Sequence, residues 1–154
     1  MNNRLGNLNK AKEQVYISMQ INGKWREAQT YEEVRDPYRG DIVAYAPVSN
    51  SADCEAALAA AYQAKDVMAA MPGFERAALL YRAADNVQAR AQAIGMAMTL
   101  ESGKPLRDSV AEAQRAAETL RLYAQEAIRI QGEHIPMDGS AMGAGKIGMV
   151  MRFP

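Results

Sequence analysis

The chain has 154 residues, of which 49% are hydrophobic and 23% charged, a composition typical of one soluble globular domain. Eighteen basic and eighteen acidic side chains give a formal net charge of zero, which argues against a nucleic-acid-binding surface. No segment offers the roughly 20 apolar residues of a membrane span, and residues 1–14 lack the apolar stretch of a signal peptide, so a cytoplasmic protein is expected.

Short strands are predicted in the first third of the chain. Residues 1–14, which are polar and weakly periodic, are expected to form a flexible arm. Asn22-Gly23 then separates two alternating segments and favours the type I′ turn of a β-hairpin. The strands expected here are residues 16–21, 24–26, 33–35 and 41–48, with a turn at Asp36-Pro37 before the last.

Three long helices are predicted next. The first is expected to begin at the N-cap Ser51 and to stop at Pro72-Gly73. The other two occupy residues 74–131, where apolar residues recur at alternating steps of four and three and so fall on one buried face of each helix. These residues are Leu80, Ala84, Val87, Ala91, Ile94 and Met98 in one helix and Leu106, Val110, Ala113, Ala117, Leu120, Ala124 and Ala127 in the other.

A sharp hinge is predicted between these two helices. Gly103 can take the left-handed conformation that closes a helix, and Pro105 fits a first helical turn because its missing N–H would have no partner there. After Gly132 the helical period ends, and the sequence predicts an extended piece from Ile135, a loop over residues 139–145 and a strand over residues 146–153.

Candidate chemistry in the chain is sparse. Gly143, Gly145 and Gly148 match the spacing of a dinucleotide-binding turn, but an extended segment follows them instead of a helix, so we reject that interpretation. Cys54 is expected in the first turn of a helix, where the dipole lowers a thiol pKa, yet Asp53 and Glu55 oppose this and no histidine is near in sequence. We therefore read Cys54 as a packed residue.

The single His134 is interpreted as a surface or packed residue. One cysteine excludes an internal disulfide, and together with one histidine it leaves too few ligands for a zinc site. From these motifs alone the sequence predicts a soluble α/β domain of undefined activity.

An ordered set of short motifs resembles the aldehyde dehydrogenase superfamily. The motifs are Ile21-Asn22-Gly23-Lys24-Trp25, Asp36-Pro37, Glu75-Arg76-Ala77, Glu101-Ser102-Gly103-Lys104-Pro105, Leu120-Arg121-x-Tyr123-Ala124, Gly132-Glu133-x-Ile135-Pro136 and Arg152-x-Pro154. No single motif is decisive, but the order is specific and covers nearly the whole chain from about residue 17.

The resemblance implies the N-terminal part of a three-domain α/β enzyme. Residues 15–131 would form part of an NAD(P)-binding domain and residues 132–154 the start of an oligomerisation β-hairpin, with the catalytic domain absent. The family's nucleophilic cysteine, general base, oxyanion-holding asparagine and cofactor-contacting lysine would all lie beyond Pro154. The resemblance therefore implies no catalytic or cofactor-binding residue in this chain, and Cys54 does not match the nucleophile's motif.

The same resemblance implies several properties of a full-length enzyme. It would use NAD or NADP, oxidise an aldehyde to a carboxylic acid and form a homo-dimer or homo-tetramer. This segment alone would be inactive and would bind no cofactor. The alternative interpretation is a noncatalytic relic or an interaction module that pairs with another chain.

One residue of the chain bears on the substrate. Counting back from Leu120, Arg115 stands where members of the family that take anionic aldehydes can carry an arginine, and the surrounding sequence is similar to the lactaldehyde, phosphonoacetaldehyde and glyceraldehyde-phosphate branch. A guanidinium pairs bidentately with phosphate or carboxylate. The competing interpretation is that Arg115 is an ordinary solvated helix residue.

Overall fold

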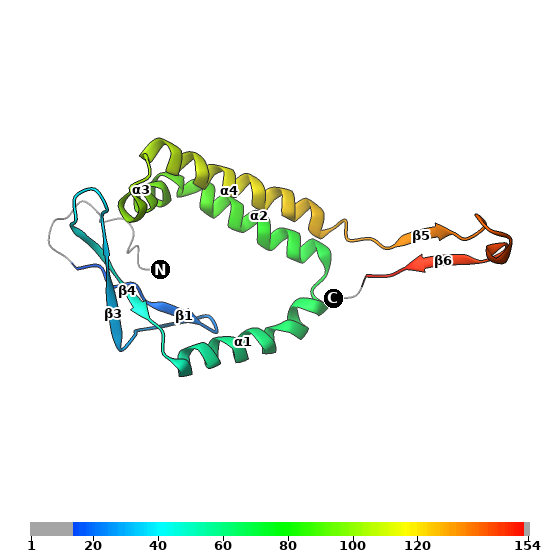
Figure 1. The fold of residues 1–154 in the computed structure, drawn as a ribbon, viewed down its shortest axis with the longest axis horizontal. Helices are drawn as coiled ribbons and strands as arrows, with labels where there is room; N and C mark the ends of the chain where they lie inside the picture. Colours follow the sequence, from blue (N-terminus) through cyan, green and yellow to red (C-terminus); the bar gives the residue numbers. More distant parts are fainter. Residues whose placement is uncertain (1–13, 153–154) are drawn as a thin grey trace.

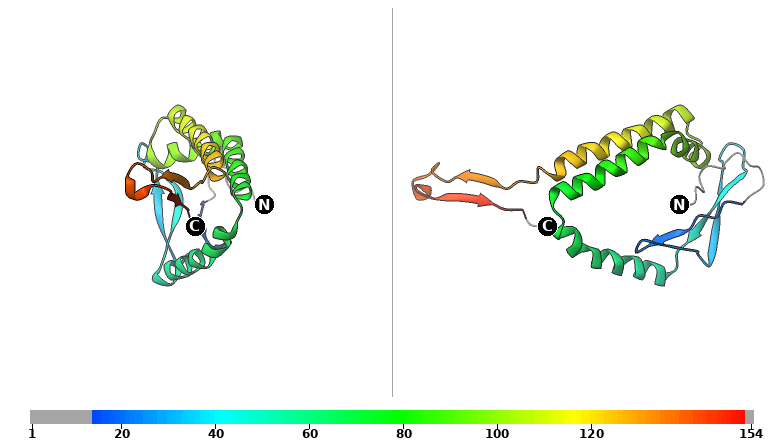
Figure 2. Two further views of the ribbon diagram at one scale, coloured as in Figure 1. Left: turned by 90° about the vertical axis from the view of Figure 1, so that its right-hand side faces the viewer. Right: turned by 180° about the vertical axis from the view of Figure 1, so that it is seen from behind.

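A computed structural model describes residues 14–152 of the chain. Its elements form an open ring of strands and helices, from which a β-hairpin projects (Figures 1 and 2). In chain order they are β1 (Met19–Ile21), β2 (Lys24–Arg26), β3 (Thr30–Arg35), β4 (Ile42–Val48), α1 (Ser51–Ala70), α2 (Gly73–Ala89), α3 (Ala91–Ser102), α4 (Leu106–Ala127), β5 (Glu133–Pro136), the 3-10 helix η1 (Ala141–Gly143) and β6 (Ile147–Val150). The predicted α/β class is confirmed, whereas the flexible arm over residues 1–14 lies, apart from Gln14, outside the described residues.

The strands form three separate antiparallel pairs, β1–β2, β3–β4 and β5–β6. Asn22 and Gly23 both have positive φ, 51° and 70°, which confirms the tight hairpin turn between β1 and β2. An isolated parallel bridge joins Tyr16 to Tyr45 of β4. The rings of these two tyrosines stack with their centroids 4.7 Å apart, so the segment before β1 is held against β4.

The helical region contains four helices, and the expectation of three was wrong. The predicted second helix divides at Arg90, which leaves helical geometry with φ −111° and ψ 10°, giving α2 and α3. The apolar alternation continues across this point, and no Gly or Pro marks it, so periodicity alone could not locate the break. The break turns α3 away from the direction of α2 (Figure 2).

Helix α4 packs against both α2 and α3, and this contact forms most of the core. The predicted apolar stripes form the buried faces, since Ala84 of α2 and Ala117 and Ala124 of α4 have no exposed surface. Leu106, which was expected in the stripe of α4, is instead 38% exposed in the first turn of that helix. The helices approach closely at Gly95 of α3, where an added Cβ would lie 2.8 Å from the backbone nitrogen of Val110. Small residues therefore let the helices approach closely along this seam.

The N-cap of helix α1 is Asn50 and not Ser51 as predicted, and Ser51 is the first helical residue. The Asn50 side chain accepts a hydrogen bond from the Asp53 backbone N–H at 2.9 Å, while the Asn50 N–H donates to the Asp53 carboxylate at 3.2 Å. This reciprocal capping box satisfies two backbone donors and so outcompetes a cap at the next residue. No residue of α1 is buried, and Leu58 and Tyr62 are 66% and 76% exposed.

The hinge between α3 and α4 has the predicted left-handed Gly103, with φ 73°. Its N–H donates to the Thr99 carbonyl at 2.9 Å and so closes α3. Pro105 is the N-cap of α4 and precedes its first helical residue, one position earlier than predicted. This is consistent with the ψ of 134° at Pro105, which is extended and not helical.

The C-terminal hairpin pairs Glu133 with Val150 and Pro136 with Ile147. The strand expected over residues 146–153 is thus shorter, and the loop expected over residues 139–145 contains the short η1 helix. Both strands extend away from the end of α4 (Figure 1). Within residues 14–152, none of the helices is both long and apolar enough to cross a membrane.

Candidate functional site

Arg115 lies on the exposed side of α4, away from the buried stripe of that helix. One turn earlier Glu112 is half-buried, and its carboxylate accepts a hydrogen bond from the Lys104 ammonium, which stands in the hinge before α4. We call Lys104, Glu112 and Arg115 the charged cluster. Two cations and one anion leave this cluster with one uncompensated positive charge.

Electrostatics within the charged cluster centre on Glu112. The hydrogen bond from Lys104, the attraction of that ammonium and the weaker attraction of the Arg115 guanidinium together hold the pKa of Glu112 below its ordinary value. Partial removal from water acts in the opposite direction, but it is outweighed. Glu112 is therefore a carboxylate at neutral pH.

The Arg115 backbone is fixed while its guanidinium remains available. The Arg115 carbonyl accepts a hydrogen bond from the Thr119 hydroxyl at 3.0 Å. Among the residues that the structure describes, no carboxylate lies within ion-pair distance of the guanidinium. An exposed guanidinium in this state can pair with an incoming carboxylate or phosphate.

Cys54 and His134 are not brought together. Cys54 is exposed in the first turn of α1, directly after β4, so the interpretation of Cys54 as a packed residue was wrong. His134 lies in β5 on the projecting hairpin (Figure 1). In the described part of the chain, no group of three or more His, Cys, Asp or Glu side chains could hold a metal ion. Within residues 14–152, no hydrogen bond or ion pair joins the side chain of either residue to an acid–base group.

The glycine-rich segment belongs to the C-terminal hairpin. Gly143 ends η1, Gly145 has φ 75° in the following turn, and Gly148 lies inside β6. In a dinucleotide-binding turn the glycines lead into a helix whose N-terminus holds the pyrophosphate, and the third glycine lies within that helix. Here that position is in an antiparallel strand, which agrees with our rejection of the match.

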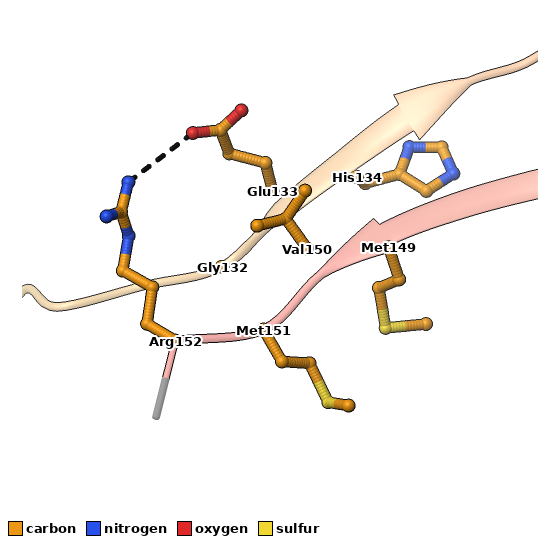
Figure 3. Close-up of a pocket in the computed structure, with 7 residues that line it drawn as sticks. All are labelled: Gly132, Glu133, His134, Met149, Val150, Met151 and Arg152. Carbon is orange, nitrogen blue, oxygen red and sulfur yellow. Dashed lines mark ion pairs between the residues drawn. The ribbon is translucent and has the colours of Figure 1, made fainter. Parts of the chain in front are cut away.

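The base of the same hairpin forms an open hollow of about 510 Å³. Glu133 and Arg152 form an ion pair of 3.6 Å across it, and Arg152 also donates to the Gln131 carbonyl at 3.0 Å. Met149 and Met151 point to one side of the chain and Val150 to the other (Figure 3). The opposite charges of Glu133 and Arg152 thus offset each other at this hollow.

Sequence reasoning singled out Arg115 but missed the pair formed by Lys104 and Glu112. Eight residues separate the two, which is outside the three- and four-residue spacings of pairs on one helix. Their contact depends on the hinge, which places Lys104 beside the second turn of α4.

Comparison with known proteins gives a consistent result. Residues 25–154 match the aldehyde dehydrogenase family. Malonate-semialdehyde dehydrogenase 1 of Bacillus licheniformis is 33% identical over 136 residues, which are 87% of this chain and 27% of that protein.

Two crystal structures show the same fold. Aldehyde dehydrogenase 21 from Physcomitrella patens, in complex with the reaction product succinate, superposes with a TM-score of 0.81 at 32% identity, covering 90% of this chain and 29% of the other. NADP-dependent glyceraldehyde-3-phosphate dehydrogenase from Bacillus halodurans, complexed with NADP, gives a TM-score of 0.79 at 27% identity, with 90% and 29% covered.

These coverages show that the chain spans about a quarter to three tenths of the length of the relatives it matches. The sequence match covers 87% of this chain and the structural match covers 90% of it. This chain belongs to the aldehyde dehydrogenase family.

Proposed function

We propose that this chain is the N-terminal part of a cytoplasmic, NAD(P)-dependent aldehyde dehydrogenase that oxidises an anionic aldehyde to a carboxylic acid. The observation that carries the proposal is the family match over residues 25–154. The chain supplies structure and a substrate contact, while the catalytic groups and the cofactor site belong to the further sequence that the longer relatives have. The segment alone is then inactive and binds no cofactor.

The exposed surface of the chain supports a role as one part of a larger fold. It exposes 12,288 Å² for a mass of 16.8 kDa. A compact monomer of this mass would expose roughly 7,600 Å². Because α1 has no buried residue, it is a principal surface for further polypeptide to cover.

The division of the chain follows the family pattern. Residues 15–131 belong to the cofactor-binding domain, and residues 132–154 begin the oligomerisation element of a homo-dimer or homo-tetramer. The projection of the β5–β6 hairpin away from the helices supports this assignment (Figure 1). So do its exposed apolar side chains, among them Ile147 and Met149 at 71% and 73%.

Arg115 is the proposed contact for the anionic end of the substrate. Its exposure on α4 and the positive charge of its cluster support this role. The names of the three relatives described above all refer to an anion: a malonate semialdehyde, a succinate product and a phosphorylated aldehyde. An arginine fork suits both carboxylate and phosphate.

The test uses the complete polypeptide that carries this segment. Replacing Arg115 by Leu should lower kcat/KM for an anionic aldehyde about tenfold or more, the worth of one charge-assisted contact. The same substitution should leave oxidation of a neutral aldehyde of equal length within about twofold. An unchanged kcat/KM for the anionic aldehyde would remove Arg115 from the proposal.

A noncatalytic interaction module is the second candidate, and the uncovered α1 surface favours it equally. The mass of the natural product separates the two candidates. A chain of several hundred residues supports the enzyme, whereas a stable 16.8 kDa species bound to a partner supports the module.

A further inference from the structure

We propose that Lys104 keeps the Arg115 guanidinium available for an anionic aldehyde by occupying the Glu112 carboxylate that would otherwise pair with it. This inference rests on the proposed function, because it assigns a specificity role around the Arg115 contact. Lys104 and Glu112 are positioning residues in this scheme and do not touch the substrate.

Glu112 lies three residues before Arg115 on α4, a spacing at which an acid and a base commonly pair on a helix surface. The structure instead shows the Glu112 carboxylate on the Lys104 ammonium. The Lys104 ammonium is the main cause of the lowered pKa of Glu112 and the Arg115 guanidinium a weaker one, so both cations attract the same carboxylate. Removal of one cation leaves the other as the remaining partner.

The hinge determines which cation binds Glu112. Gly103 reverses the chain direction at the end of α3, and an added Cβ there would lie 2.9 Å from the Pro37 ring, so the turn is packed against the β3–β4 connection. The Lys104 N–H also lies 3.4 Å from the Ser102 hydroxyl. The backbone of Lys104 is therefore held beside the start of α4, where its ammonium reaches the Glu112 carboxylate.

Two other acidic residues of α4, Asp108 and Glu118, form no ion pair with Lys104 in the described chain. Asp108, one turn before Glu112, pairs with Arg107 at 3.5 Å. Glu118, three residues after Arg115, is exposed and makes no ion pair with Arg115 in the described chain. Glu118 thus has the same sequence distance from Arg115 as Glu112 but no contact with Lys104. It provides a matched control.

The test measures KM and kcat of the complete polypeptide with two probes. Succinate semialdehyde carries a carboxylate, and butanal is a neutral aldehyde of the same carbon number. Lys104→Met should raise KM for succinate semialdehyde about two- to fivefold, the range of one exposed ion pair, with kcat unchanged and without a matching change for butanal. Lys104→Arg, which keeps the charge, should remain near the wild-type value.

Double variants test whether Lys104 acts through Glu112. Glu112→Gln in the Lys104→Met background should restore the wild-type KM, because the competitor for Arg115 is then gone. Glu118→Gln in the same background should restore nothing. The inference is overturned if Lys104→Met leaves KM unchanged, if Glu112→Gln fails to restore it, or if Glu118→Gln restores it equally well.

Arg115→Leu separates the inference from the function on which it rests. If Arg115→Leu leaves the KM for succinate semialdehyde unchanged, the Arg115 contact itself is wrong and the role of Lys104 falls with it. If Arg115→Leu raises KM while Lys104→Met does not, the proposed function stands and only the present inference fails.

Discussion

Replacing Gly95 by Ala tests whether α3 and α4 are packed in contact at the level of their backbones. The new Cβ would lie 2.5 Å from Val110 Cγ2, 2.8 Å from the Val110 nitrogen and 2.9 Å from its Cα. Ordinary carbon contacts are about 3.5–4.0 Å. Rotation of Val110 relieves the first contact only, so the two helices must separate by roughly 0.5–1 Å.

The expected magnitude follows from two opposing effects. Overpacking of this kind costs about 1–3 kcal/mol, while Ala in place of Gly in a helix interior gains about 1 kcal/mol. We therefore expect a net loss of about 1 kcal/mol in the free energy of unfolding, within a range of about 0–2.

The assay is urea unfolding of the complete polypeptide that carries this segment, followed by far-ultraviolet circular dichroism. Gly139→Ala is the control, because that position has open space around it and no positive φ, so its effect should stay within about 0.5 kcal/mol. Stabilisation of Gly95→Ala by about 1 kcal/mol, the full gain in helix propensity, would refute the close approach of α3 and α4.

Four further outcomes are expected. Asn50→Ala should destabilise α1 by about 1 kcal/mol, measured as a loss of helical circular dichroism at a fixed urea concentration, because the capping box is lost. Gly103→Ala should cost about 1–2 kcal/mol in urea unfolding, because φ is 73° and Pro37 leaves little room. Folding lowers the pKa of Glu112, so the stability that this carboxylate contributes is present above the ordinary glutamate pKa and is lost as the pH falls through the folded pKa. Lys104→Met should therefore make Tm depend less on pH in the acid range. The 154-residue chain alone should self-associate in sedimentation experiments and bind a hydrophobic dye in fluorescence experiments. The reason is that it exposes about 1.6 times the surface of a compact monomer. A monomer that binds no dye would contradict this expectation.

The helical stripes could be predicted because burial imposes a period of 3.6 residues, and Ala84, Ala113 and Ala117 are buried as that period requires. The division at Arg90 could not, since it depends on how α3 must turn to meet α4 and leaves no local mark in the sequence. The cap of α1 was misplaced by one residue because Asn50 and Ser51 are both good caps, and only the reciprocal bond with Asp53 distinguishes them.

The candidate site, like the fold, could be predicted from the sequence only in part. Arg115 could be identified from its place before a recognisable motif, and its exposure depends only on lying outside the apolar stripe. The pairing of Glu112 with Lys104 could not be deduced, because two local preferences compete for one carboxylate. The hinge conformation, set by the left-handed Gly103, settles that competition.

The hinge thus connects the stability of the fold with the chemistry of the proposed site. Gly103 ends α3, Pro105 caps α4, and Lys104 between them is directed to Glu112. A substitution that disturbs this turn changes both the packing of the two helices and the charge available at Arg115. A substitution at the helix seam, such as Gly95→Ala, changes packing while leaving the Lys104 contact in place. Comparing substrate preference between the two kinds of variant therefore distinguishes an electrostatic effect of the hinge from a general loss of stability.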